Sequence, residues 1–279
     1  MAKCPYCGEE AGFLRKLHQE CQQKHDDGVK KVLSLAQNYI FSRNPLERLE
    51  QELNQVTSST FIDPEQTKGL LIQAWGQAVD TTLEEGDFST EIENSLIAFK
   101  DHFSLSRDDL DNIGAWPKIV KMAILRDIFE GKVSERVIIS GSLPFNFQKG
   151  ETIVWLFHGV KYFEERSRRQ YEGGSHGVSL RVAKGVYYRV GSFRAQPVVT
   201  QETVHVDTGQ LAVTNKHIYF AGDRKAFKLP FNKIVAFTPY DDGIGIQRDA
   251  MTAKPQSFLT GDGWFTYNLI VNLAKMSTA

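Results

Sequence analysis

The spacing of hydrophobic residues changes near residue 143, and this change limits the possible folds more than any other feature. Between residues 43 and 135 apolar residues recur at the three- and four-residue spacing of a helix face. After residue 151 they alternate with polar residues in short runs separated by Gly, Pro and Asp turns, which is typical of strands. At 279 residues the chain has room for about two domains. We therefore predict an α+β multidomain protein, helical first and strand-rich afterwards.

The helical part carries sequence signals for helix starts. Asp63 followed by Pro64 has the order of an N-cap and a proline in the first helical position. Ser89 precedes another helical stripe, and Ser106 with Asp109 has the spacing of a capping box. These signals predict a helical bundle over residues 43–136.

The N-terminal segment contains all three cysteines of the chain and two of its seven histidines. The residues CPYC place two thiols on one tight turn, and a helix pattern follows them. Zn²⁺ prefers four nitrogen or sulfur ligands in a tetrahedron. The sequence predicts a structural zinc ion held by four of five residues, and leaves open which histidine completes the site. The five are Cys4, Cys7, His18, Cys21 and His25.

The CPYCG turn resembles the knuckle of bacterial zinc ribbons and short zinc fingers. We expect a small zinc module over residues 1–42, made of this knuckle and the helix after it. Three unrelated reduced cysteines, or a catalytic zinc, are weaker alternatives, because so short a segment has neither a core nor a pocket of its own. Its basic residues are offset by acidic ones, so a nucleic-acid-reading finger is disfavoured.

Residues 83–110, LEEGDFSTEIENSLIAFKDHFSLSRDDL, resemble the repeated unit of the tellurite-resistance-type TerB helical fold. This resemblance implies a TerB-like domain over residues 43–136. Some members of that family carry a carboxylate metal site, which implies a metal-dependent enzyme as one alternative. Acidic residues at a helix start are also expected from the helix dipole alone. The residues that would form such a site are Glu84, Glu85, Asp87 and Glu91.

Residues 209–237, GQLAVTNKHIYFAGDRKAFKLPFNKIVAF, are similar to the core of bacterial PH-like and GRAM domains. His217 stands where that family usually has arginine. The resemblance implies a β-barrel over residues 143–279, plugged by a terminal helix, that binds lipid head groups, peptides or other subunits and is not catalytic. Within it the sequence predicts hairpin turns at Thr208–Gly209 and at Gly222–Asp223.

The net charge of −1 hides an asymmetry between the two halves of the chain. Residues 1–142 hold 16 Lys+Arg against 23 Asp+Glu, and residues 143–279 hold 17 against 11. The basic second half predicts either docking on the acidic half or a surface for an anion or partner. The cations expected to form that surface are Arg166, Arg168, Arg169, Arg181, Lys184, Arg189 and Arg194.

These features together predict a non-catalytic, zinc-binding adaptor or scaffold that recruits a protein partner or an anionic surface through its PH-like domain. Phospholipid- or phosphoinositide-dependent membrane attachment is the first alternative. No nucleophile elbow, P-loop or dinucleotide turn is present in the sequence, so an enzyme is not expected. Three cysteines without a disulfide framework, and no apolar run of about 18 residues, predict a cytoplasmic protein, in solution or peripheral to a membrane. Nucleic acid is not expected as a partner, and the oligomeric state is left open.

Overall fold

The protein is described by a computed structural model in which the chain divides into two compact units, Met1–Glu130 and Gly131–Ala279. The first unit is helical and the second is mostly β, so the predicted α+β class is confirmed. None of the described helices is long and apolar enough to cross a membrane. Side chains are not described for residues 166–201 and Thr278. The residues outside the description altogether are Met1, 12–15, Arg43, Asp87, Ser134, 138–140, 173–174, 184–185, 194–195, 251–252 and Ala279.

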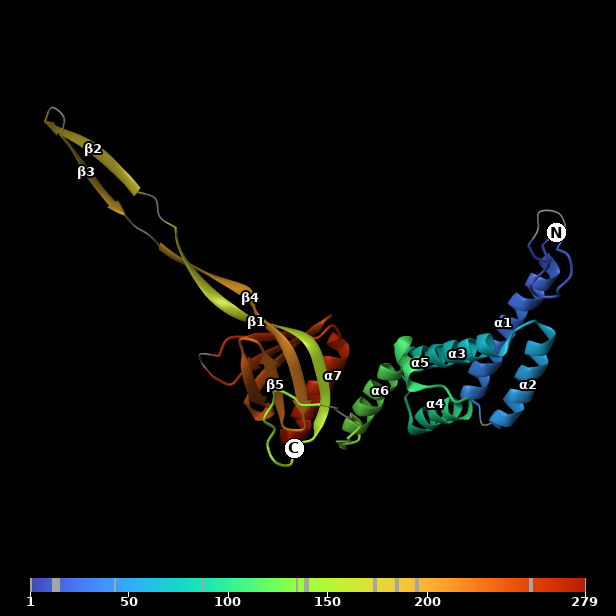
Figure 1. Ribbon diagram of the computed structural model, residues 1–279. Coiled ribbons are helices and arrows are strands. Elements are labelled where there is room, and N and C mark those ends of the chain that lie inside the picture. The colour runs from blue at the N-terminus through green and yellow to red at the C-terminus, as the bar shows by residue number, and fades with distance from the viewer. Residues whose placement is uncertain are drawn as a thin grey trace. The chain divides into compact units, whose positions relative to one another are not determined.

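The first unit is a bundle in which α1, α2 and α3 lie beside one another and α4 to α6 follow (Figure 1). The bounds of its helices are α1 Gln19–Ile40, α2 Leu46–Ser59, α3 Pro64–Glu85, α4 Thr90–His102, α5 Arg107–Asn112 and α6 Ala115–Phe129. Three starts carry the predicted caps. Asp63 accepts a hydrogen bond from the backbone N–H of Gln66 at 2.7 Å, and Ser89 caps α4 in the same way. Ser106 and Asp109 form the capping box.

One hydrophobic core runs through this unit. Val32 and Ala36 of α1 are fully buried in the same cluster as Trp75 of α3 and Leu96 of α4. The indole Nε1 of Trp75 donates to the backbone oxygen of Leu96 at 2.8 Å, which joins α3 to α4 inside the core. Because α1 contributes to this core, the helix predicted within residues 1–42 belongs to the same compact unit as the bundle.

We expect Trp75→Ala to lower the unfolding free energy of the helical unit by about 4 kcal/mol. The change opens a large cavity and leaves the Leu96 carbonyl without its donor. Phe129→Ala is the control, since the Phe129 side chain is 65% exposed and its loss should cost less than about 0.5 kcal/mol. Urea unfolding followed by circular dichroism at 222 nm measures both. Equal losses in the two variants would contradict this account of the core.

The second unit is a curled, seven-stranded antiparallel sheet followed by a helix (Figure 1). Its strand order is β6-β5-β4-β1-β9-β8-β7, and β2 and β3 form a separate two-stranded pair. The bounds are β1 Ile153–Glu172, β2 Ser175–Ala183, β3 Val186–Phe193, β4 Gln196–Thr214, β5 His217–Gly222, β6 Ala226–Pro230, η1 Phe231–Lys233, β7 Ile234–Tyr240, β8 Gly243–Arg248, β9 Gln256–Leu259 and α7 Gly263–Thr278. The predicted β-barrel is therefore present only as a curled half-barrel, while the predicted terminal helix is confirmed.

The sheet closes around aromatic residues contributed by its central strands. Tyr162 of β1, Phe220 of β5 and Phe258 of β9 are fully buried, and their rings lie 5 to 6 Å apart. The terminal helix α7 packs against β7, β8 and η1. Its Phe265 meets Trp155 of β1 at a centroid distance of 5.0 Å, so the helix joins the same core.

The predicted turn at Thr208–Gly209 is wrong, because β4 continues straight through both residues. Thr208 and Gly209 pair with Lys161 and Val160 of β1, and this long pairing overrides the local preference for a turn. Gly209 instead marks a close approach, since a Cβ there would lie 2.1 Å from the backbone oxygen of Ala221. The predicted hairpin at Gly222–Asp223 is confirmed by the β5–β6 pairing.

β1 and β4 continue past the sheet as a two-stranded ribbon, which Figure 1 shows as a long projecting pair. Pairing between β1 and β4 extends to Glu172 opposite Gln196. On the other side of β1, however, β9 pairs no further than Glu164, and β5 leaves β4 at Gly209. We name residues 165–172 of β1 and 196–203 of β4 the ribbon.

A buried carboxylate ties the segment before β1 to the sheet. The Glu151 side chain is 0% exposed and accepts hydrogen bonds from His217 Nδ1 and, at 2.7 Å, from the hydroxyl of Tyr219. The backbone N–H of Gln148 donates to the same carboxylate at 3.2 Å. Burial alone would raise the pKa of Glu151, but the hydrogen bonds from Tyr219, Gln148 and His217 outweigh it and lower that pKa. The histidine that replaces the expected arginine thus has a structural partner.

We expect Glu151→Gln to lower the unfolding free energy of the second unit by about 2 kcal/mol at pH 7. A carboxyl whose pKa is lowered by folding stabilises the fold above its unfolded pKa of about 4.3. The carboxyl loses that stabilising contribution as the pH falls through its pKa in the folded protein. The difference in unfolding free energy between wild type and variant should therefore become smaller below about pH 4. Urea unfolding at a series of pH values measures this difference. Asp249→Asn, at an exposed position, is the control; a gap that persists unchanged at pH 3 would contradict the assignment.

Candidate metal centre

Backbone hydrogen bonds hold the first two cysteines on a tight knuckle. The N–H of Gly8 donates to the oxygen of Cys4 at 2.9 Å, and the N–H of Cys4 donates to the oxygen of Glu9 at 2.7 Å. Gly8 has a φ of +77°, a backbone conformation that glycine adopts without steric cost. An isolated bridge between Lys3 and Glu10 closes the loop behind it. Cys4 and Cys7 are thereby presented on one short turn.

The start of α1 supplies the other two side chains. The helix begins at Gln19, and His18 is its N-cap residue with extended backbone angles of φ −85° and ψ 137°. Cys21 lies in the first turn of the same helix. Because the backbone of His18 is extended, its side chain points toward the knuckle, as the side chain of Cys21 also does.

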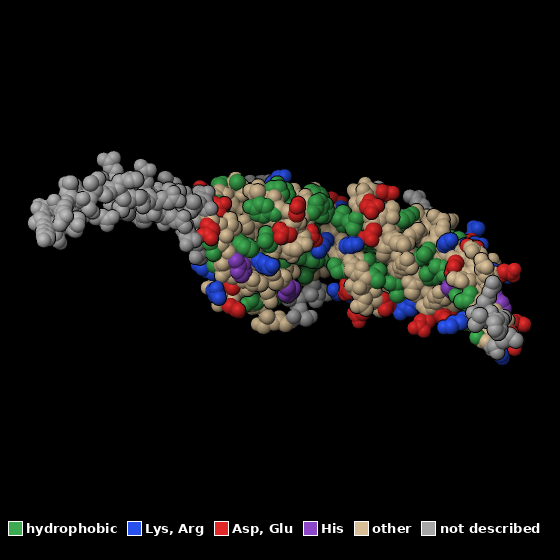
Figure 2. Space-filling model, turned by 90° about the horizontal axis from the view of Figure 1, so that it is seen from above, with side chains coloured by type: hydrophobic (Ala, Val, Ile, Leu, Met, Phe, Trp, Pro, Cys, Tyr) green, Lys and Arg blue, Asp and Glu red, His purple; other side chains and the backbone are tan. Residues whose placement is uncertain are grey.

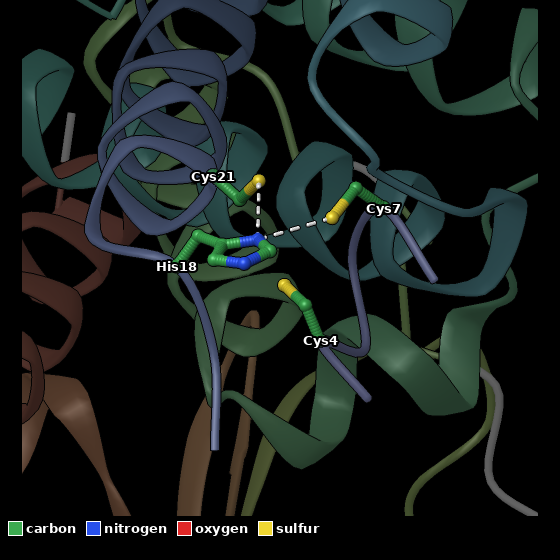
Figure 3. Close-up of side chains that lie close together, drawn as sticks. All are labelled: Cys4, Cys7, His18 and Cys21. Atoms are coloured by element: carbon green, nitrogen blue, oxygen red, sulfur yellow. Dashed lines mark hydrogen bonds between the residues drawn. The ribbon is translucent and has the colours of Figure 1, made fainter. Parts of the chain in front are cut away.

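The four side chains converge on one point, as Figure 3 shows. The ligand atoms of Cys4, Cys7, His18 and Cys21 all lie within 4.8 Å of one another. His18 Nδ1 is 3.2 Å from the sulfur of Cys7 and 3.9 Å from that of Cys21. Ligands at tetrahedral zinc are separated by about 3.5–3.8 Å, given bond lengths of about 2.0–2.3 Å. The donor set therefore fits a metal ion, and the separations, which reach 4.8 Å, would shorten slightly on binding; all three cysteines are free thiols.

A backbone carbonyl orients the histidine. His18 Nε2 lies 3.0 Å from the oxygen of Glu10 and donates its proton there, which leaves Nδ1 free to act as a ligand. Sequence analysis missed this role of Glu10, because a main-chain contact has no sequence signature. Four protein ligands with no open position, and a fully buried Cys4, are features of a structural rather than a catalytic site.

The turn also acts on the acidity of the thiols. Burial raises the pKa of Cys4, but backbone hydrogen bonds at Cys7, His18 and Tyr6 outweigh burial and bring that pKa to about 6. Burial, followed by hydrogen bonding and charge from Cys7, raises the pKa of Cys21 to about 11. A divalent cation among the sulfurs favours the thiolate at every position and so reverses the Cys21 shift.

His25 lies outside the cluster and performs a different task. It sits one helical turn beyond Cys21, and its ring stacks on Tyr6 of the knuckle at a centroid distance of 4.8 Å. His25 Nε2 lies 3.1 Å from the side-chain oxygen of Gln66 on α3. Tyr6 also contacts Phe61, at 5.8 Å. His25 therefore connects the knuckle to the helical bundle.

The predicted carboxylate site has no counterpart among the residues that the structure describes. Glu84 and Glu85 are exposed at the end of α3, and Glu91 is exposed in the first turn of α4. None of them belongs to the Cys/His group, which is the only described cluster with the spacing for a metal. Asp87 lies outside the described residues.

The predicted basic surface lies in the part of the second unit whose side chains are not described. Of its seven cations, three lie on β1, one on β2 and one on β3. Lys184 and Arg194 fall outside the described residues altogether. The role of this surface stays a prediction. On β1 are Arg166, Arg168 and Arg169; Arg181 is on β2 and Arg189 on β3.

Comparison of the sequence with protein-family models and with curated proteins finds no match.

We expect one zinc ion per purified chain. Cys4→Ser should abolish binding, because a hydroxyl is a poor replacement for a thiolate, and His18→Ala should weaken zinc affinity at least about 100-fold. His25→Ala is the matched control: it should keep full zinc content, since this ring is stacked on Tyr6 and is not a ligand. Elemental analysis and chelator competition measure these effects. Loss of zinc from His25→Ala to the same extent as from His18→Ala would refute the ligand set.

Proposed function

We propose that this protein is a non-catalytic adaptor with three parts: a structural zinc knuckle, a TerB-like helical bundle and a PH/GRAM-like sheet that recruits a partner. The four-ligand cluster supports a structural metal, because it has no open position for a substrate. The curled sheet with a terminal helix supports a PH-like domain, a fold used for binding. In the cell the adaptor recruits a protein partner or an anionic surface.

The observation that carries this proposal is the concentration of positive charge in residues 166–200, which we name the basic hairpin. Residues 166–200 hold seven Lys+Arg and one Asp+Glu, while the rest of residues 143–279 holds ten of each. The whole positive excess of the second half thus falls within residues 166–200, the stretch of sequence that includes β2, β3 and the ends of β1 and β4. On the face seen in Figure 2, by contrast, acidic, basic and hydrophobic side chains are interspersed over the coloured residues.

A two-stranded ribbon without a third strand or a helix beneath it gains little stability from its own contacts. Such an element is therefore suited to contacting another molecule. Its charge favours an anionic one, and an anionic membrane attracts nearby Lys and Arg with about 1 kcal/mol each. This favours phospholipid attachment as the second candidate function, through the same hairpin.

The metal has a supporting role in this proposal. Zinc holds the knuckle in shape, and Tyr6 then stacks on His25 at the surface of the bundle. The metal thereby secures the N-terminal segment to the helices, as structural zinc does in small modules that lack a core. No step of chemistry is required of it.

We expect the Arg166→Ser/Arg168→Ser/Arg169→Ser variant to bind anionic liposomes about a hundredfold more weakly than wild type at low salt, with unchanged melting. The control removes the same charge elsewhere in the second unit, through Lys225→Ser/Lys228→Ser/Lys233→Ser at exposed positions. Sedimentation with phosphatidylserine vesicles measures binding. A large fall in melting temperature would show that the arginines support the fold. If wild-type protein does not bind anionic vesicles, membrane attachment is rejected as a function and recruitment of a protein partner remains.

A further inference from the structure

A groove of about 910 Å³ lies on the second unit, where the β7–β8 turn meets β1 and β9. Its volume falls in the range of sites that bind ligands. None of the four residues of the Cys/His cluster lines it. The lining residues are Phe163, Glu165, Thr203, Pro239, Tyr240, Asp241, Asp242, Ser257 and Leu259.

The groove has a floor of two hydrophobic residues and a serine, and an aromatic wall. Phe163, Ser257 and Leu259 are half-buried and occupy the paired strands β1 and β9. The exposed Tyr240 forms the wall and lies across Gly245 of β8. A Cβ on Gly245 would come within 2.9 Å of the Tyr240 hydroxyl oxygen, so the glycine makes room for the ring. Tyr240 is thereby held with part of its surface open to solvent.

The rim of the groove is acidic. Glu165, Asp241 and Asp242 line it, and no ion pair involving them is found within the described part of the chain. The main chain of the turn is nevertheless fixed. The oxygen of Asp242 accepts from the N–H of Thr260 at 2.8 Å, and the oxygen of Asp241 accepts from that of Gly263 at 3.2 Å. The carboxylates are therefore presented on a firm backbone, which lowers the entropic cost of binding.

We propose that this groove binds an extended, basic segment of a partner protein, with arginine or lysine at alternate positions. Alternate side chains of an extended segment face the same side, so several cations reach the rim together. Guanidinium groups form paired hydrogen bonds with carboxylates and stack on aromatic rings such as that of Tyr240. This inference rests on the proposed adaptor role and names one partner class for it.

The groove and the hairpin then give one domain two binding surfaces of opposite charge. Glu165 stands where β1 leaves the sheet, directly before the basic stretch 166–200, so the two surfaces adjoin along the chain. The hairpin of a second copy is also basic, but a reciprocal exchange would place two hairpins, each with a net charge of +6, beside one another. Like charges at such proximity oppose the exchange, which favours a separate partner.

The test uses the full chain and a fluorescein-labelled octapeptide of alternating arginine and serine, with binding followed by fluorescence anisotropy at low salt. We expect Asp241→Asn/Asp242→Asn to weaken binding about tenfold and added salt to weaken it further. Tyr240→Leu keeps the bulk of the wall and removes its aromatic face, and should weaken binding about threefold. The matched control, Asp223→Asn/Asp249→Asn, removes the same charge from exposed positions outside the groove and should change affinity less than twofold.

Several outcomes would overturn the inference. They are an absence of binding by wild type, equal binding of an alternating glutamate and serine peptide, or equal weakening by the control pair. Sedimentation velocity measures the oligomeric state as a further test. If wild type forms oligomers and the Asp241→Asn/Asp242→Asn variant does not, the occupant of the groove is a second copy of the chain instead. Zinc content and liposome binding of that variant should equal those of wild type. If only peptide binding fails, the proposed role of the groove is therefore rejected, while the adaptor proposal is not affected.

Discussion

Backbone pairing along β1 is the constraint on which the second unit depends. β1 pairs with β4 over its whole length and with β9 over Lys161–Glu164, so it is the strand that joins the two halves of the curled sheet. Its buried Tyr162 anchors the aromatic core, and its outward neighbour Phe163 forms part of the groove floor. Where β9 ends, β1 continues only as a ribbon with β4. One strand thus supports the core, the groove and the basic hairpin.

In the first unit, the corresponding link is made by side chains. A knuckle of this size has no hydrophobic core of its own, so we expect a metal ion at the Cys/His cluster, together with a ring stack, to hold it. The Tyr6–His25 contact connects it to α1, and the His25–Gln66 contact extends this connection to α3. The metal centre and the bundle therefore form one compact unit, and a change in the knuckle is expected to affect the helices.

The distribution of charge supports our proposal that the protein is an adaptor. We propose that the closed Cys₃His cluster is structural, because it leaves no open position for a substrate. The basic hairpin and the acidic groove are opposite in charge, and we propose that each selects its partner first by charge and then by shape. An adaptor with these two surfaces would bring together two molecules that do not bind each other.

The sequence by itself determined the features that depend on neighbouring residues. Helix caps at Asp63, Ser89 and Ser106, the change of period, and the cysteines of the knuckle all follow from local geometry, and the structure contains each of them. Only the tertiary structure decided between His18 and His25, because both histidines have a plausible spacing and the choice depends on where α1 begins. The tertiary structure also decided that β4 continues through Thr208–Gly209, because pairing with the distant β1 outweighs a local turn preference. The Glu151–His217 pair joins residues 66 positions apart, and the groove brings Phe163 of β1 together with Leu259 of β9; spacing along a chain does not encode contacts at such distances.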